Sequence, residues 1–403
     1  MTRPAGSIVT RRDATRVGGA FGLVTVVLML TVWLSSEHLP RQEQAASPRF
    51  TTMQHGDEVL GPWLYWDARH FGAIVRDGYN DADVVRYQRG GAADVAFFPG
   101  YPLVVGAVDR LVGEIGLALV LVTLAAGAVL VQVLYRWLRL QTSAAAAGWA
   151  VAVTLLYPWS YVLIAAGYSD ALFLALTVAS FLLVEHDRPV LAGLVGALAT
   201  ATRLAGVGLL IGLALRVAER RGALRFDGWR PHLDRSKLHR PDAGVLLAAS
   251  GIVAWMAFCW VRYASPVAFS TAQRGWGQGF GPRSWFKLGL VDQVVNNADT
   301  FFVLRLVAHG VAIVVLAAAV PSVFRRFGVA YGTYTAIVVG LPLLGSANFA
   351  SNGRLGLAAF PCFALAGEHL AANQTRLARP ALVASGVVLV GVASCWGRGY
   401  WMA

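Results

Sequence analysis

The chain has 403 residues, of which 57% are hydrophobic and 14% are charged, and its mean hydropathy is +0.57. Soluble domains carry roughly 25% charged residues, so the composition excludes an ordinary soluble protein and predicts a polytopic, all-α membrane protein. The net charge of +12 would suggest nucleic acid binding in a soluble protein, but the basic residues fall mainly in short loops between apolar runs. That pattern orients a membrane protein, so the expected partner is the lipid bilayer and not nucleic acid.

Cysteine and histidine spacing give no sign of a metal centre. Cys259, Cys362 and Cys395 lie in apolar segments, no CxxC pair occurs, and no two histidines have the HExxH spacing of a zinc site. We therefore expect no disulfide, no metal site built by the protein and no cofactor.

The first predicted element is an apolar run over residues 17–36, preceded by four arginines in residues 1–16. A cleaved signal peptide is the alternative, with Ala45-Ala46-Ser47 as a poor cleavage site. Signal-peptide apolar cores are about 7–15 residues long, which favours an uncleaved first span. The basic N-terminus is then predicted to be cytoplasmic.

Residues 37–94 are predicted to form a long exterior segment that contains the catalytic centre. Nine of the 22 acidic residues of the chain fall in it: Glu37, Glu43, Asp57, Glu58, Asp67, Asp77, Asp81, Asp83 and Asp94. Many of these carboxylates are expected to be solvated surface groups.

Asp67 is the strongest catalytic candidate in that segment because aromatic residues flank it, including Trp66 and Phe71. A carboxylate among aromatic side chains is partly desolvated, which raises its proton affinity and suits it to act as a general base. The simpler alternative is that Asp67 caps a helix over residues 68–75. Both roles can hold together.

The next segment contains two prolines three residues apart, Pro99 and Pro102, which stop a regular helix from starting before the second one. The apolar remainder is shorter than the ~20 residues that span a bilayer. The sequence therefore leaves open whether residues 97–112 cross the membrane or form a re-entrant or interfacial piece. The second alternative makes residues 115–134 run inward, as the positive-inside rule prefers.

Residues 95–396 as a whole are predicted to form the remaining helical bundle. The basic loop 216–242 is expected to be cytoplasmic and to face anionic lipid headgroups. Arg203 is a lone charge inside an apolar run, and an arginine in such a place usually binds something. The alternative is that it snorkels to the headgroups.

On this topology, residues from distant loops reach the same exterior membrane face: Asp67, Tyr101, Asp170, Arg203, Gln273, Trp276 and Arg354. Transporters place polar residues near the bilayer midplane, often in repeated halves. Here the polar residues are displaced to one side and no repeat is visible. The arrangement is typical of an enzyme that takes one substrate from the membrane and acts at its surface.

Several short motifs occur in order along residues 60 to 365: Trp66-Asp67 with Gly78-Tyr79, Ala96-Phe97-Phe98-Pro99 with Tyr101-Pro102, Tyr168-Ser169-Asp170-Ala171-Leu172-Phe173, Thr202-Arg203, and Arg354 with Phe360-Pro361. Their combination resembles the signatures of the PIG-V-like mannosyltransferases, which are integral membrane glycosyltransferases of the GT-C superfamily. The chain departs from the family at His70-Phe71, where an aromatic pair such as Trp-Tyr is frequent, and at Asp170, where Glu is common.

The resemblance implies a single GT-C-like domain over residues 1–403 with about 10–11 spans. It also implies inverting transfer of mannose from a polyprenyl-phosphate donor to a hydroxyl of a glycolipid or glycan. Asp67 would take the acceptor proton, and Arg203 or Arg354 would stabilise the departing phosphate without a metal. The residues expected to bind the acceptor or the sugar are His70, Tyr79, Tyr101, Asp170, Gln273 and Trp276.

Simpler roles and other functions stay open at this point. His70 could be a satisfied loop histidine, and Tyr79, Tyr101 and Trp276 could belong to an interfacial aromatic belt. The chain could also be a transporter or flippase of a lipid-linked saccharide, or a non-catalytic membrane subunit of a glycosylation complex. The acceptor could be a GPI intermediate, a bacterial glycolipid, a cell-wall polysaccharide or a protein hydroxyl.

Overall fold

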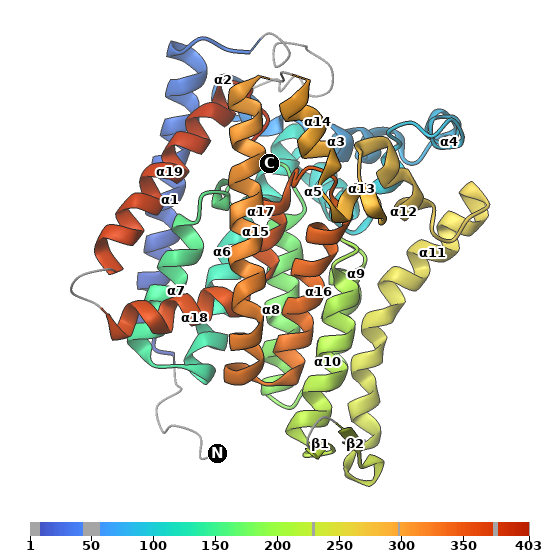
Figure 1. Ribbon diagram of the computed structural model, residues 1–403, viewed down its shortest axis with the longest axis vertical. Coiled ribbons are helices and arrows are strands. Elements are labelled where there is room, and N and C mark those ends of the chain that lie inside the picture. Colours follow the sequence, from blue (N-terminus) through green and yellow to red (C-terminus); the bar gives the residue numbers. More distant parts are fainter. Residues whose placement is uncertain (1–8, 43–56, 228–229, 297–298, 374–377, 403) are drawn as a thin grey trace.

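The computed structural model describes residues 9–42, 57–227, 230–296, 299–373 and 378–402. Within these residues almost every element is a helix, and the strands β1 (Leu224–Asp227) and β2 (Arg230–Leu233) form one short antiparallel hairpin. The helices pack side by side in an elongated bundle (Figure 1). The expectation of an all-α bundle is confirmed.

Five helical segments of the described chain are long and apolar enough to cross a membrane, as expected of a multi-pass membrane protein. They are α1 (Arg11–His38), α6 (Ile115–Gln141), the 3-10 helix η6 (Arg240–Ala248) continued by α11 (Ala249–Tyr263), α15 (Thr300–Phe327) and α19 (Arg379–Gly397). A bent segment adds a sixth if it counts as one span. It consists of α17 (Asn352–Leu355), η8 (Gly356–Ala358) and α18 (Phe360–Ala372), with an angle of 82° before α18.

Five further helices of the bundle are shorter: α7 (Ala144–Leu156), α8 (Asp170–Glu185), α9 (Pro189–Thr200), α10 (Gly206–Arg220) and α16 (Val329–Gly345). The expectation of about 10–11 spans counted these runs as separate crossings, although each has fewer than the ~20 residues that reach across a bilayer. Among them α8 is buried along nearly its whole length, in the middle of the bundle (Figure 1).

Helix α1 starts ahead of the apolar run 17–36 because Thr10 and Asp13 form a capping box. Asp13 N donates to Thr10 Oγ1 at 3.2 Å, and Thr10 N donates to Asp13 Oδ2 at 3.0 Å. The helix runs from the lower side of the bundle to its upper end in Figure 1. The possible cleavage site Ala45-Ala46-Ser47 lies outside the described residues.

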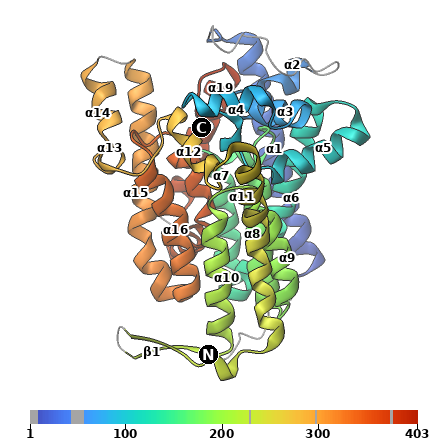
Figure 2. The same cartoon turned by 90° about the vertical axis from the view of Figure 1, so that its right-hand side faces the viewer.

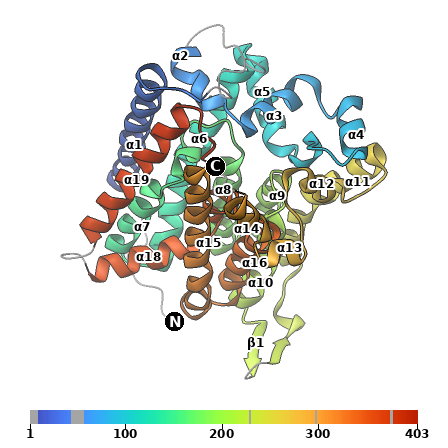
Figure 3. The same cartoon turned by 45° about the horizontal axis from the view of Figure 1, so that its top comes forward.

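Short helices gather at one end of the bundle, which is the upper end in Figure 1 and comes forward in Figure 3. They are α2 (Asp57–Leu60), η2 (Gly61–Leu64), α3 (Asp67–Asp77), α4 (Asp81–Gln88), η3 (Asp94–Ala96), α5 (Gly100–Val112), α12 (Ala268–Ala272), η7 (Gln273–Trp276), α13 (Pro282–Trp285) and α14 (Leu288–Val295). The hairpin in the basic loop 216–242 lies at the opposite end (Figure 2). The expected exterior segment 37–94 is therefore largely helical in its described part.

Helix α5 has 13 residues, which is too short to cross a bilayer, and it packs against α3 and α6 at the upper end. It stops at Gly113, which has φ 73 and so closes the helix in the left-handed conformation that glycine adopts easily. This geometry favours the non-crossing alternative for residues 97–112.

Candidate active site

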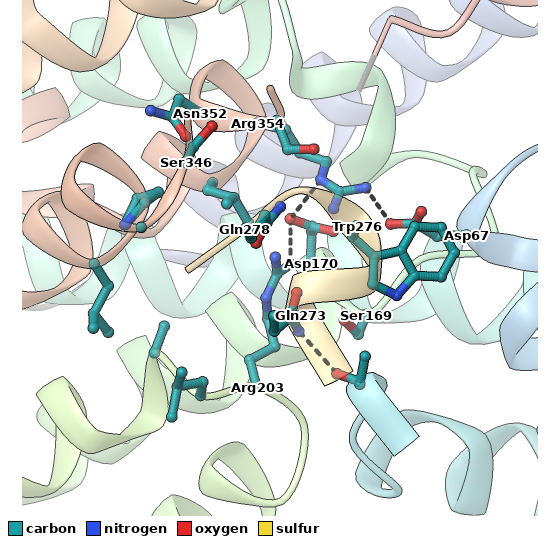
Figure 4. Close-up of a pocket in the computed structure, with 18 of the residues that line it drawn as sticks. Asp67, Ser169, Asp170, Arg203, Gln273, Trp276, Gln278, Ser346, Asn352 and Arg354 are labelled. Atoms are coloured by element: carbon teal, nitrogen blue, oxygen red, sulfur yellow. Dashed lines mark hydrogen bonds and ion pairs between the residues drawn. The ribbon is translucent and has the colours of Figure 1, made fainter. Parts of the chain in front are cut away.

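Four charged side chains from distant parts of the chain form an alternating series (Figure 4). Arg354 Nη1 donates to Asp67 Oδ2 at 2.7 Å, and Arg354 Nε lies 3.8 Å from Asp170 Oδ1. Asp170 also forms an ion pair with Arg203. Charges this far inside a bundle need such partners, because an isolated ion loses its hydration without compensation.

Each of the four stands at an end or a break of a helix. Asp67 and Asp170 are the first residues of α3 and α8, where the positive end of the helix dipole favours a carboxylate. Arg203 lies in the break between α9 and α10, and Arg354 lies in the single turn of α17. Breaks and short helices thus bring the polar side chains to one place.

The expected cap at Asp67 needs correction. Trp66 occupies the N-cap position of α3 and makes no side-chain capping bond, so the Asp67 carboxylate is left for Arg354. Trp66 has φ 58 and ψ −116, a backbone conformation that a bulky residue rarely adopts. Ser351, just before α17, also has a positive φ of 62. Such conformations cost about 1–3 kcal/mol each and cluster at functional sites.

Tyr168 supports the pair of Asp67 and Arg354. The centre of the Arg354 guanidinium lies 4.7 Å from the centroid of the Tyr168 ring, within reach of a cation–π interaction. The backbone N–H of Asp67 donates to the Tyr168 hydroxyl at 3.3 Å. Burial raises the pKa of Tyr168 well above its usual value, so the phenol stays neutral beside the carboxylates.

The charged series borders a cavity of about 490 Å³, a size typical of small-molecule sites. One part of its lining is polar: Asp67, His70, Ser169, Asp170, Thr202, Arg203, Gln273, Gln278, Asn352 and Arg354. Another part is apolar: Phe173, Leu174, Leu204, Val338, Leu341, Pro342 and Leu357. The cavity can therefore receive a molecule with a polar head and an apolar tail.

Most of the expected site residues meet at this cavity, including His70, Gln273 and Trp276. Gln273 Nε2 donates to the carbonyl oxygen of Ala96 at 3.3 Å, which holds η7 against η3. Trp276 contacts the His70 ring edge to face, with centroids 4.8 Å apart.

Tyr79 and Tyr101 are not brought to the cavity. The Tyr79 hydroxyl donates to the carbonyl oxygen of Phe97 at 2.7 Å, and its ring packs against Trp255. Tyr101 is fully buried, and its hydroxyl bonds to the carbonyl oxygen of Leu119 at 3.0 Å. The geometry gives both tyrosines packing roles, and their expected contact with sugar has no support from it.

Three further residues belong to the site although sequence reasoning did not select them. The Tyr168 ring packs against the Arg354 guanidinium, Asp94 binds His70, and Asn352 lines the cavity. Within the described residues, the amide of Asn352 has no hydrogen-bond partner although the residue is fully buried. The polar Ser-Asn loop beside Arg354 was the one signal in the sequence that could have indicated Asn352.

The described residues include no group of three or more His, Cys, Asp or Glu side chains that could hold a metal ion. Asp67 and Asp170, the two carboxylates of the cavity, are both engaged by arginines. The donor set therefore suits charge pairing and anion binding better than coordination of a cation.

The chain matches no protein-family model and no curated protein. Among solved structures it is similar to a crystal structure of the Archaeoglobus fulgidus oligosaccharyltransferase in complex with zinc and sulfate, at 15% identity and a TM-score of 0.42. The match covers 92% of this chain and 53% of that one, so the chain spans about half the length of the oligosaccharyltransferase. A likeness of this size carries no argument about fold or activity.

Proposed function

We propose that the chain is a GT-C-type membrane mannosyltransferase that uses a polyprenyl-phosphate donor and a glycolipid or glycan acceptor at the exterior face of the cell membrane. The observation that carries the proposal is the series Asp67, Arg354, Asp170 and Arg203 at a cavity with a polar and an apolar part. The identification of mannose as the sugar and of polyprenyl phosphate as its carrier rests on the motif resemblance.

In the proposed reaction the acceptor oxygen attacks the anomeric carbon on the face opposite the phosphate, which inverts its configuration. The bond from that carbon to the phosphate oxygen breaks, and the phosphate leaves with the electron pair. Asp67 takes the proton of the acceptor hydroxyl. Arg354 engages Oδ2 of Asp67, and no described contact engages Oδ1, which is therefore open to a hydroxyl.

Arg354 and Arg203 are the groups that would stabilise the negative charge on the departing phosphate. Within the described residues the Nε of Arg354 has no hydrogen-bond partner although it is buried, which leaves a donor for a phosphate oxygen. Asp170 keeps both guanidinium groups in place while no phosphate is bound. The apolar part of the cavity suits the first isoprene units of the donor.

The hydrogen bonds at the end of α8 away from the cavity favour an enzyme over a transporter. Glu185, the last residue of α8, accepts from Arg216 Nε and Arg220 Nη1 at 2.7 Å each and from the Tyr331 hydroxyl at 2.9 Å. This buried network ties α8, α10 and α16 together. A flippase would have to open this end to release its cargo, at the cost of separating buried ions.

The test is transfer of radiolabelled mannose from polyprenyl-phosphate mannose to a membrane lipid extract. The purified protein is compared with Asp67→Asn. Asp77→Asn is the matched control, a carboxylate on the same helix that forms an ion pair with its neighbour Arg76 and does not line the cavity. We expect Asp67→Asn to lose transfer by about 10²–10⁴-fold and Asp77→Asn to transfer normally.

Full transfer by Asp67→Asn would refute the assignment of the base. Movement of an intact lipid-linked saccharide across proteoliposomes without transfer would establish the transport alternative. Normal function in cells with Asp67→Asn, and no transfer by the purified protein, would favour a non-catalytic subunit.

A further inference from the structure

His70 is held in one orientation and one tautomer by groups behind the cavity wall. Its Nδ1 lies 2.6 Å from Asp94 Oδ1, and the other oxygen of Asp94 accepts from Arg86 Nη2 at 2.6 Å. A carboxylate only accepts hydrogen bonds, so Nδ1 carries the proton. In the neutral ring Nε2 is then an acceptor, and no hydrogen bond in the described part of the chain engages it.

The side chains that orient Asp94 are themselves held by hydrogen bonds. Arg86 also bonds to Asp83 Oδ1 at 3.2 Å, and Asp83 Oδ2 accepts from the Tyr263 hydroxyl at 2.5 Å. Asp83 and Asp94 are buried. Residues of α4, η3 and α11 therefore orient a ring that is 30% exposed and lines the cavity. The charged groups behind the ring are Asp94, Arg86 and Asp83.

Asp67 and His70 stand three residues apart on α3, so they share one face of the helix, with about 5–6 Å between their Cβ atoms. Both line the cavity, and each has an acceptor atom without a described partner, Oδ1 and Nε2. A lone hydroxyl could satisfy only one of these acceptors. Two neighbouring hydroxyls on one molecule could donate to both.

Aromatic rings complete this part of the wall. Phe97 stacks on His70 with centroids 4.8 Å apart and planes 10° apart, and Trp276 meets both rings edge to face. Trp276 is 37% exposed. An apolar surface next to fixed acceptors suits a molecule with an apolar face and a row of hydroxyls, which describes a pyranose ring.

We propose that the His70–Asp94 pair is the specificity element for the acceptor. It binds the hydroxyl adjacent to the one that Asp67 deprotonates, so that the enzyme selects a vicinal diol over a lone alcohol. This inference rests on the proposed transferase function.

Periodate tests the diol without knowledge of the acceptor, because it cleaves vicinal diols and leaves lone alcohols intact. The lipid extract is oxidised, reduced and freed of reagent before the donor is added, and the control extract receives periodate already quenched with glycol. We expect only the oxidised extract to lose acceptor activity. Undiminished transfer to it would overturn the proposal.

The role of His70 is tested with His70→Asn. His186→Asn is the matched control, because His186 follows the last residue of α8, at the end of that helix away from the cavity. We expect His70→Asn to raise the KM for the extract about tenfold, the loss of one hydrogen bond, with an unchanged donor KM. Asp94→Asn removes the carboxylate that holds the proton on Nδ1 and orients the ring, so its acceptor KM should rise in the same direction.

An unchanged acceptor KM in His70→Asn would overturn the role of the pair while leaving the transferase intact. Absence of transfer by the wild type to untreated extract would overturn both. If Asp94→Asn fails to fold, His70→Asn alone decides, because His70 is partly exposed.

Discussion

Helix α8 carries a carboxylate at each end, and the two ends differ in how far their neighbours are satisfied. Asp170 meets Arg203 and Arg354 at the cavity, where the Nε of Arg354 and the amide of Asn352 lack described partners. Glu185 receives three hydrogen bonds, from Arg216, Arg220 and Tyr331. The cavity end thus leaves polar groups open to a ligand, whereas at the other end both carboxylate oxygens of Glu185 are engaged within the described residues.

The largest effect that this comparison predicts is on activity, at the cavity end. Asp170→Asn removes the carboxylate between the two guanidinium groups, so that Arg203 is no longer positioned for the phosphate and Arg354 is held by Asp67 and Tyr168 without Asp170. We expect transfer to fall by about 10²–10³-fold, as for loss of a preorganised electrostatic group. The assay is mannose transfer. The midpoint temperature of thermal unfolding should fall less than in a variant that unpairs arginines away from the cavity, because Arg203 lines the cavity, where water can solvate it.

Glu185→Gln is the matched change at the other end. It removes the carboxylate that Arg216 and Arg220 share, while Arg216 keeps its bond to Glu219. We therefore expect the free energy of unfolding to fall by about 3 kcal/mol. Transfer per folded molecule should be kept. Equal loss of stability in the two variants, or a catalytic defect in Glu185→Gln, would remove the distinction between the two ends.

A third prediction concerns Gly353, next to Arg354. A Cβ there would lie 2.6 Å from Trp159 Cε2 and 2.7 Å from His309 Nδ1, which accepts the Gly353 N–H at 2.9 Å. Gly353→Ala must therefore push α17 outward. Overpacking of this kind costs about 1–3 kcal/mol, and the displaced Arg354 should bind Asp67 less well.

The rate of transfer and the midpoint temperature of thermal unfolding should both fall in Gly353→Ala. Gly340→Ala is the control, because a Cβ at that position of α16 meets nothing within 4 Å and alanine is the better helix former. Unimpaired transfer by Gly353→Ala would mean that α17 does not position Arg354 for the reaction.

The meeting of Asp67, Arg203 and Arg354 could be predicted because the sequence contains its cause. Each charge interrupts or borders an apolar run, and successive antiparallel passes return such breaks to the same end of a bundle. The all-α class follows from the same runs. The bend of 82° before α18 also has a visible cause, because Pro361 stands at the start of that helix.

The contact between His70 and Asp94 behind the cavity wall could not be predicted from the sequence. Asp94 and His70 belong to separate short elements, and their contact depends on how α3, α4 and η3 pack, which no periodicity specifies. Tyr79 and Tyr101 looked the same as Trp276 in the sequence, since aromatic residues near a membrane face serve packing, the interface or stacking alike. Their burial separates these roles only once the fold is known.

The smallest predicted effect lies at two neighbouring buried phenols. Tyr168→Phe keeps the ring beside Arg354 and removes the hydroxyl that accepts from the N–H of Asp67, a loss of about 1 kcal/mol. We expect transfer to fall less than tenfold. Since burial keeps the Tyr168 phenol neutral, the ratio of variant to wild type should not depend on pH.

Tyr161→Phe is the matched control, because in the described part of the chain the buried Tyr161 hydroxyl has no hydrogen-bond partner. Removal of an unsatisfied hydroxyl should leave transfer unchanged and stability equal or slightly higher. Loss of transfer in Tyr161→Phe that matches Tyr168→Phe would show that both hydroxyls act through a shared contact. In that case the unsatisfied polar atoms at the cavity end would extend deeper into the bundle than the charged series alone.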